Sequence, residues 1–426
     1  MLSPIFLLTT ITLVAQEKTF VREYTYKANE MDSKLSCRSI AINQLRSTLL
    51  NEVGVYVESE SILKTTDVNG KFSQDFVENI ATISAGITKL VVLDETWNGQ
   101  LLWMKAAITI DTTSLGESLK QLANDRQRVR EMKELSEKLN STLKELDNVK
   151  RDLAAAANGG NHQVLNQKYG DQIKRLNSVE YSLIAKARVD KSDWQAAMAN
   201  FTKAIELDPH CSLDFAGRGL SKFHLNDDLG AMTDYSRAIE LDPNSPLGYA
   251  GRGSVKYELA DYRGALMDFT KAIEIDSEIP VTYFGRGTSK AQLGEYEGAI
   301  EDFTKAIELD PKQAAPSYQM RGYTKSLMSD YVGAIVDYSK AIEMDPRKSS
   351  NYLYRGAARM LIGDFQLAKV DFTKAIELDK YSGDAYFQRG LSQMRLGQKA
   401  SGCLDFHKAI ELGFERAHEG IRRFCN

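Results

Sequence analysis

The sequence has few of the residues from which catalytic and metal sites are usually built. Its 426 residues include 4 cysteines and 5 histidines, and no histidine stands near a nucleophile and an acid in a recognisable catalytic motif. Phosphate-binding loops, dinucleotide fingerprints and zinc-protease helices are missing as well. The sequence therefore predicts a protein that is not an enzyme and that needs no cofactor and no metal ion.

An excess of one charge is also missing. The 54 basic and 58 acidic residues give a net charge of −4 and are interspersed, so no surface for nucleic acid is indicated. Long apolar runs are confined to residues 1–15, which are uncharged and precede a polar stretch. This segment predicts a secretory signal peptide over residues 1–16 and therefore an exported protein. A buried strand and a membrane anchor are the alternatives, although a span needs about 20 apolar residues.

The most informative feature that is present is a repeat of 34 residues in the C-terminal half. The segment Asp-Phe-Thr-Lys-Ala-Ile-Glu, or a near copy, occurs at 200–206, 234–240, 268–274, 302–308, 337–343, 371–377 and 405–411. Five of the six steps are 34 residues, and the one near Gln313 is 35. A constant period of this length predicts stacked copies of one helical unit, because a single copy cannot bury its apolar face alone.

Each repeat carries the same landmarks when Tyr181 and its six counterparts are numbered as position 4. Position 8 is glycine in six repeats, position 20 is small, position 24 is aromatic and position 27 is alanine. Proline follows at position 32 in four repeats, as at Pro209. Small residues at positions 8 and 20 allow two antiparallel helices to approach closely, and the proline ends the second helix.

This pattern resembles the tetratricopeptide repeat over residues 178–414. The resemblance implies a mainly α protein, a right-handed α-solenoid of seven helical hairpins. It also implies a concave groove in which positions 2, 5, 9 and 12 of each first helix contact a protein or peptide partner. The predicted groove residues are Leu213, Ala216, Leu220, Phe223, Leu247, Ala250, Tyr257, Val281, Phe284, Thr288, Gln319, Tyr323, Leu353, Met360, Phe387 and Leu391. The alternative is that some of them pack against a neighbouring repeat.

The chemistry of these groove positions narrows the kind of partner. Most of them are apolar or aromatic and few are charged, and continuous apolar surface usually marks a binding site. The Lys and Asn clamp with which chaperone-binding relatives hold C-terminal carboxylates is missing. We therefore expect an amphipathic helix or an extended apolar peptide as the ligand.

Position 7 departs from the usual family pattern, in which it is apolar. It is arginine in six repeats, and position 23 is aspartate in the same six, whereas the first repeat has Ile184 and Asn200. Because the two residue types occur together, we predict structural ion pairs between the two helices of each repeat. The pairs are Arg218–Asp234, Arg252–Asp268, Arg286–Asp302, Arg321–Asp337, Arg355–Asp371 and Arg389–Asp405. A row of arginines that bind a ligand is the alternative.

Residues 17–112 follow a different rhythm and predict a small α+β domain. Alternation over 19–27 indicates a strand, and apolar residues four apart over 32–53 indicate a helix that ends at Gly54. We expect a strand at 55–62, a short helix at 73–82, and a hairpin of 88–97 and 100–111 around Asn98-Gly99.

This domain resembles the N-terminal domain of bacterial flagellar assembly protein T and of related exported lipoproteins. The resemblance rests on residues 36–42, 83–87 and 95–99, the last leading to Trp103. It implies a module of envelope assembly without catalysis, and hence a location in the periplasm or cell envelope of a bacterium.

Residues 113–157 predict a long charged helix with leucines at the spacing of an imperfect coiled coil. This helix could pair with its copy in a homodimer or fold against its own chain. Residues 158–177 then predict a joint with a lead-in helix, and Gly159-Gly160 indicates flexibility there.

The cysteines near the C-terminus predict a covalent link. Cys403 stands at an inward position of the last repeat, and Cys425 lies on the apolar stripe of a capping helix at 415–426. A Cys403–Cys425 disulfide is expected in an oxidising compartment. A zinc site that adds His407 and His418 is the alternative.

Together these features predict an exported scaffold or adaptor that binds a protein partner in its concave groove. A structural envelope protein that self-assembles through the long helix and the repeats is the alternative.

Overall fold

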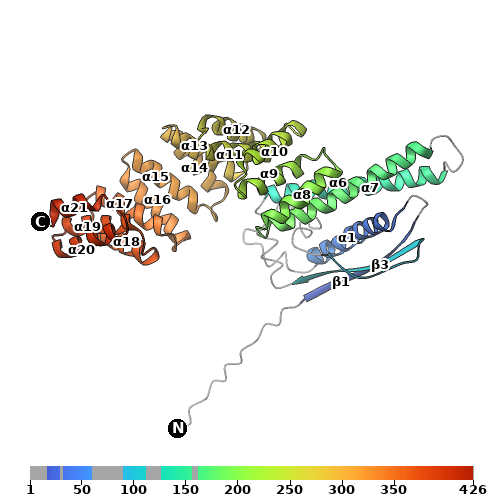
Figure 1. The fold of residues 1–426 in the computed structure, drawn as a ribbon, viewed down its shortest axis with the longest axis horizontal. Coiled ribbons are helices and arrows are strands. Elements are labelled where there is room, and N and C mark those ends of the chain that lie inside the picture. Colours follow the sequence, from blue (N-terminus) through green and yellow to red (C-terminus); the bar gives the residue numbers. More distant parts are fainter. Residues whose placement is uncertain (1–16, 29–31, 60–89, 112–125, 156–161, 426) are drawn as a thin grey trace, which may run out of the picture. The chain divides into compact units, whose positions relative to one another are not determined.

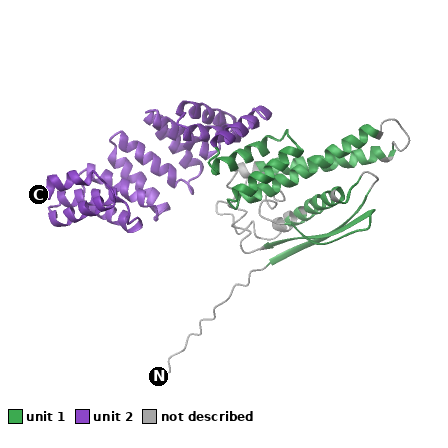
Figure 2. Ribbon diagram, viewed as in Figure 1, with its two compact units in different colours: residues 1–227 green, residues 228–426 purple. Residues whose placement is uncertain are grey.

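The computed structural model describes residues 17–28, 32–59, 90–111, 126–155 and 162–425. The chain divides into two compact units, residues 1–227 and 228–426 (Figure 2), and each is described by itself. The predicted signal peptide, the short helix at 73–82 and the glycines of the predicted joint lie outside the described residues. Within them, no helix is both long and apolar enough for a membrane span.

The first unit begins with a three-stranded antiparallel sheet. Its strands are β1 (Glu17–Lys27), β2 (Leu90–Trp97) and β3 (Leu101–Asp111), in the order β1-β3-β2. The predicted hairpin is present, and Gly99 has a φ of +96°, which suits glycine at its turn. Alternate residues of β3 from Leu102 to Ile110 are buried on one face. Helix α1 (Lys34–Ser59) packs against β1 and β3 (Figure 1).

Helix α1 is longer than the sequence predicted. It continues through Gly54 to Ser59, so the expected strand at 55–62 is wrong as far as Ser59. The buried stripe from Cys37 to Val53 packs against the sheet, and this tertiary packing outweighs the cost of about 1 kcal/mol that a glycine imposes on a helix. The β-branched residues after Gly54 read as a strand only because that packing cannot be seen locally.

The long charged helix folds against its own chain. Helix α6 (Arg126–Ala155) packs against α7 (His162–Val189), and the two run side by side in Figure 1. Leu139 and Leu146 of α6 are buried in one core with α1, the sheet and Leu176 of α7. Two of the leucines that suggested a homodimer, Leu139 and Leu146, are therefore used within the chain, whereas residues 113–125 of the predicted helix lie outside the described residues.

Most of the remaining described residues form helical hairpins, in agreement with the predicted solenoid. The first helix of each hairpin, helix A, is the C-terminal part of α7, then α9 (Ser212–His224), α11 (Pro246–Glu258), α13 (Pro280–Gln292), α15 (Ala315–Leu327), α17 (Ser349–Leu361) and α19 (Gly383–Arg395). The second helix, helix B, is α8 (Trp194–Leu207), α10 (Asp228–Leu241), α12 (Tyr262–Ile275), α14 (Tyr296–Leu309), α16 (Tyr331–Met344), α18 (Phe365–Leu378) and α20 (Lys399–Glu411). From α10 to α21 (Ala417–Phe424), each helix packs against the next.

Glycine at position 8 is required by the close contact between helix A and helix B. A Cβ atom at Gly356 would lie 2.7 Å from Cε1 of Phe372, the aromatic residue at position 24 of the same repeat. The Phe372 ring is fully buried, so it has no free space into which to move. The backbone of helix A therefore rests directly on this ring.

A network of buried ion pairs joins the helices of the second unit. Arg286 donates from Nε to Asp302 Oδ2 at 2.9 Å and from Nη2 to Oδ1 at 2.6 Å, and Lys290 Nζ adds a contact to Oδ2 at 2.8 Å. The hydrogen bonds to Asp302 raise the pKa of the Arg286 guanidinium. The same bidentate geometry occurs in Arg252–Asp268, Arg321–Asp337, Arg355–Asp371 and Arg389–Asp405. The partners of the sixth predicted pair, Arg218 and Asp234, belong to different units.

The same arginines also connect one repeat to the previous one. Arg321 Nη1 donates to Thr304 Oγ1 at 2.8 Å, and Arg355 Nη1 donates to Ser339 Oγ at 3.0 Å. Each guanidinium also lies over the aromatic ring at position 4 of its own helix, as Arg321 does over Tyr318 at 5.3 Å. The arginines are thus occupied on several sides by their own repeat and by the previous one.

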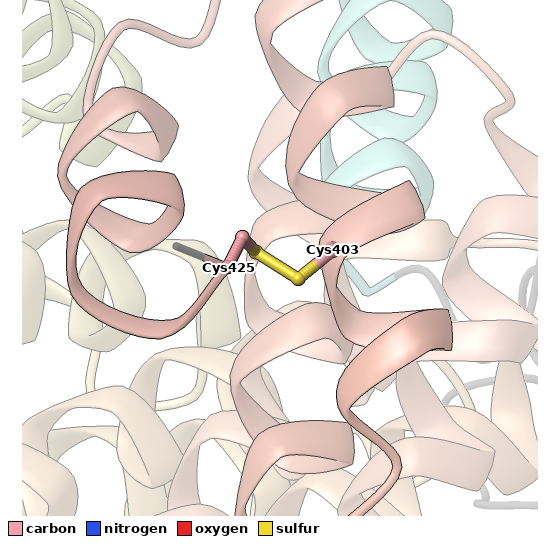
Figure 3. The surroundings of a disulfide bond; sticks show 2 residues. All are labelled: Cys403 and Cys425. Carbon is pink, nitrogen blue, oxygen red and sulfur yellow. A yellow bond between two sulfur atoms is a disulfide. The ribbon is translucent and has the colours of Figure 1, made fainter.

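The C-terminal end is closed by α21 and a disulfide. Cys403 of α20 is bonded to Cys425, which follows α21, with Cα atoms 5.8 Å apart (Figure 3). Ala417 and Ile421 of α21 pack near the buried ring of Phe406. Because the two cysteines are bonded to each other, neither is available as a thiolate ligand for zinc, and His407 is exposed.

We predict that the Asp302→Ala substitution lowers the free energy of unfolding by about 3–5 kcal/mol, because it leaves Arg286 and Lys290 buried without their anion. Glu308→Ala is the matched control, since it breaks an exposed Lys305–Glu308 pair that contributes about 0.5 kcal/mol. Urea unfolding followed by circular dichroism measures both. Equal losses in the two variants would contradict the structural role of the network.

Candidate partner-binding site on the concave face

The predicted groove positions of the second unit lie on successive A helices. Val281 and Tyr323 are exposed. The others are half-buried, namely Leu247, Ala250, Tyr257, Phe284, Gln319, Leu353, Met360, Phe387 and Leu391. Thr288 is a correction, because it is buried and its hydroxyl donates to the carbonyl of Gly285 at 2.9 Å.

Several of the half-buried aromatic residues also support the contacts between helices. The ring centroid of Phe284 lies 5.8 Å from that of Phe303, and Phe387 lies 5.6 Å from Phe406 and 5.3 Å from Phe414. Substitutions at these positions would alter packing as well as the surface. The exposed members of the groove are therefore the better guide to binding.

An exposed apolar patch lies on two neighbouring A helices and on the residue that follows each of them. It consists of Tyr323, Leu327, Met328, Tyr354, Leu361 and Ile362, which we call the α15–α17 patch. Leu361 is 63% exposed and Tyr323 is 41% exposed. The rings of Tyr323 and Tyr354 approach to 6.2 Å between centroids, which joins the two helices across the surface. Gln319 Nε2 donates to Ser350 Oγ at 3.3 Å and joins the same helices nearer their N-termini.

The sequence analysis did not identify Leu327 and Leu361. Both stand at position 13, where other repeats have polar residues, among them Glu258, Gln292 and Arg395. This change from polar to apolar at one repeated position can be found by comparing the sequences of the repeats. Positions 2, 5, 9, 12 and 13 of α15 and α17 carry no charged residue.

Position 6 of helix A also changes along the second unit. Position 6 is Gly251 in the third repeat, where a Cβ atom would lie 2.2 Å from the ring of Tyr235. In the sixth repeat the same position is Tyr354, which is exposed and lies 5.9 Å from the ring of Tyr338. The larger side chain adds an aromatic surface to the groove that the earlier repeats do not have.

Comparison with known proteins agrees with this architecture. Residues 280–313 match the family model of the tetratricopeptide repeat. The hairpin of α13 and α14 is therefore a tetratricopeptide repeat. No curated protein is a significant match to this sequence.

Several solved structures match parts of this chain. YrrB, a TPR protein with an unusual peptide-binding site, is 22% identical with a TM-score of 0.38, and the match covers 43% of this chain and 95% of YrrB. A tetratricopeptide repeat protein from Parabacteroides merdae ATCC 43184 is 21% identical with a TM-score of 0.43, covering 59% of this chain and 99% of that one. Pseudomonas aeruginosa pilF is 17% identical with a TM-score of 0.45, covering 50% of this chain and 96% of pilF.

In the first unit, several of the predicted groove positions are covered. Leu213 and Ala216, which we expected in the groove, are buried, whereas Leu220 and Phe223 are half-buried. Helix α6 packs against α7, and its Glu131 pairs with Lys186 at position 9, one of the positions at which the groove is predicted. The chain thus places one of its own helices where the repeat pattern predicted open surface.

A buried carboxyl group lies at the edge of this covered region. Asp214 of α9 is fully buried, and neither of its oxygens accepts a well-formed hydrogen bond. Burial raises its pKa, and the groups that face it are Ser182 and Lys186 of α7, Cys211 beside α9 and Lys138 of α6. Burial also raises the pKa of the Cys211 thiol to about 12, so this cysteine is an unreactive thiol.

We predict that Asp214→Asn stabilises the protein at neutral pH. Because the pKa of Asp214 is raised in the folded state, its contribution to stability is present below the unfolded pKa and is lost as pH rises towards the folded pKa. The amide cannot ionise, so the variant should melt roughly 2–4 °C higher at pH 7.5, and the difference should shrink towards pH 4. Asp152→Asn, at an exposed site on α6, is the control. A stabilisation independent of pH would contradict this account.

Proposed function

We propose that this protein is an exported adaptor of the bacterial cell envelope that holds a protein partner in the concave groove of its tetratricopeptide repeats. The α15–α17 patch is the observation that carries the proposal. Exposed apolar residues on neighbouring helices, without charges among them, are the kind of surface that binds another polypeptide. An amphipathic helix or an extended apolar peptide suits this surface because both present apolar side chains on one side.

Two further observations support export. A structural disulfide such as Cys403–Cys425 is typical of proteins in oxidising compartments, of which the periplasm is one. The apolar segment at residues 1–15 supplies the expected signal peptide. The resemblance of the N-terminal domain to envelope assembly modules supports the cell envelope as the proposed location.

We predict that a photo-crosslinking amino acid at position 323 or 361 captures the partner when the full chain is expressed in its own cells. The same label at Met267, which is 72% exposed on helix B, should capture little, because it lies outside the groove. Mass spectrometry identifies the adduct. Capture from position 267 equal to that from the patch would overturn the groove as the binding site. An adduct made only with a second copy of the chain would favour self-assembly.

We predict that Cys403 and Cys425 resist alkylation in protein isolated from cells without reductant, because each is bonded to the other. After reduction both should react, and mass spectrometry of the peptides counts the added groups. Buried Cys37 and Cys211 should react only after unfolding, with or without reductant, which provides an internal control. Alkylation of Cys403 and Cys425 without reductant would contradict export to an oxidising compartment.

A further inference from the structure

Helix α6 is itself a helix that packs on predicted groove positions of a repeat. Its direction is opposite to that of α7, because Glu131 pairs with Lys186 near the end of α7 whereas Glu145 lies 3.9 Å from Arg175. Its leucines enter one core with Val179, which stands at position 2 of the first repeat. The contacts on positions 2 and 9 are those expected of a ligand in the groove.

A lysine fixes α6 to the end of the first hairpin. Lys138 Nζ lies 2.8 Å from Oδ2 of Asp208, the residue that ends helix B at position 31. Asp208 Oδ1 accepts the backbone N–H of His210 at 3.2 Å, which leaves Oδ2 turned towards α6. Glu131 and Lys138 are seven residues apart, about two helical turns, so they contact the repeat from one face of α6.

The aspartate at position 31 recurs with the same local geometry in later repeats. It is Asp242, Asp276, Asp310, Asp345 and Asp379. In the fifth repeat, Asp345 Oδ1 accepts the backbone N–H of Arg347 at 3.2 Å, as Asp208 Oδ1 does in the first. Position 9 of that repeat is Tyr323, the centre of the α15–α17 patch, in place of Lys186.

We propose that the α15–α17 patch binds a partner helix in the pose in which α7 holds α6. This inference rests on the proposed function and names the chemistry of its ligand. The partner helix runs antiparallel to α15, with a lysine on Asp345 and an apolar side chain seven residues earlier on Tyr323. Leucines four and eight residues after that apolar residue, the counterparts of Leu135 and Leu139, complete its contact face.

The chain supplies the probe for a direct test. A labelled peptide of residues 126–155 carrying Glu131→Leu has the required pattern, and its binding to the full chain is measured by fluorescence anisotropy. We expect saturable binding that is at least tenfold tighter than that of the unmodified peptide. In the same pose, the unmodified peptide would bring the charged side chain of Glu131 against the apolar patch. Tyr323→Glu in the protein should abolish binding.

The lysine contact is tested by a double-mutant cycle. Asp345→Asn in the protein and Lys138→Met in the peptide should each weaken binding about 5–10-fold, which is within the net range of a single hydrogen bond that competes with water. Combined, they should weaken it no further than either alone, because both remove the same contact. Asp242→Asn, the same position in another repeat, is the matched control and should leave binding unchanged.

Three outcomes would overturn the proposed pose. The first is that the effects of Asp345→Asn and Lys138→Met on binding are additive. The second is that Asp208→Asn, and not Asp345→Asn, abolishes binding, which would mean that the peptide replaces α6. The third is that neither peptide binds. None of them affects the photo-crosslinking result, so failure of the pose is distinguishable from failure of the groove as a binding site.

Discussion

The second unit depends on the ion pairs that the buried aspartate at position 23 makes with cations of helix A. Removing a carboxylate from water is costly unless cations and hydrogen bonds compensate, and here an arginine and, in four of the five pairs, a lysine or arginine one turn later supply them. These cations all come from positions 7 and 11 of helix A. Positions 5 and 9 of the A helices from α11 to α19 carry no charged residue, whereas position 2 of α19 is Asp384. The cations of helix A that hold the hairpin together therefore stand at other positions than 5 and 9.

The two ends of the array require different solutions, because an end repeat has no neighbour on one side. In the first repeat Asn200 replaces the aspartate, and its amide donates to the carbonyl of Ala196 at 2.7 Å, so no cation is needed. Helices α1 and α6 cover α7 there and share its core. At the other end α21 covers Phe406, and the disulfide holds this short helix in place.

Repetition made much of this structure predictable, since seven copies of one unit reveal which positions vary together. The helix pairs, the glycine at position 8 and the partners Arg286 and Asp302 follow from that comparison alone. What a repeat cannot reveal is contact with elements outside it. Leu213 and Ala216 are buried although their positions predict exposure, and the strand expected after Gly54 is helix because α1 packs on the sheet. Both errors concern tertiary contacts that local patterns do not contain.

Comparison of the repeats also separates the positions that hold the fold from the positions that vary. Positions 8, 23 and 24 hardly change from the second repeat to the seventh, whereas position 9 is Leu220, Ser254, Thr288, Tyr323, Ala357 and Leu391 in turn. A residue with no partner inside its hairpin can change without loss of the fold, so differences between repeats accumulate on the concave face. Tyr323 and Leu361 belong to this set, and the Arg321–Asp337 and Arg355–Asp371 pairs hold their helices, α15 and α17, against the second helix of each hairpin. A helix bound there would meet a surface that is already ordered, which reduces the entropy lost on binding.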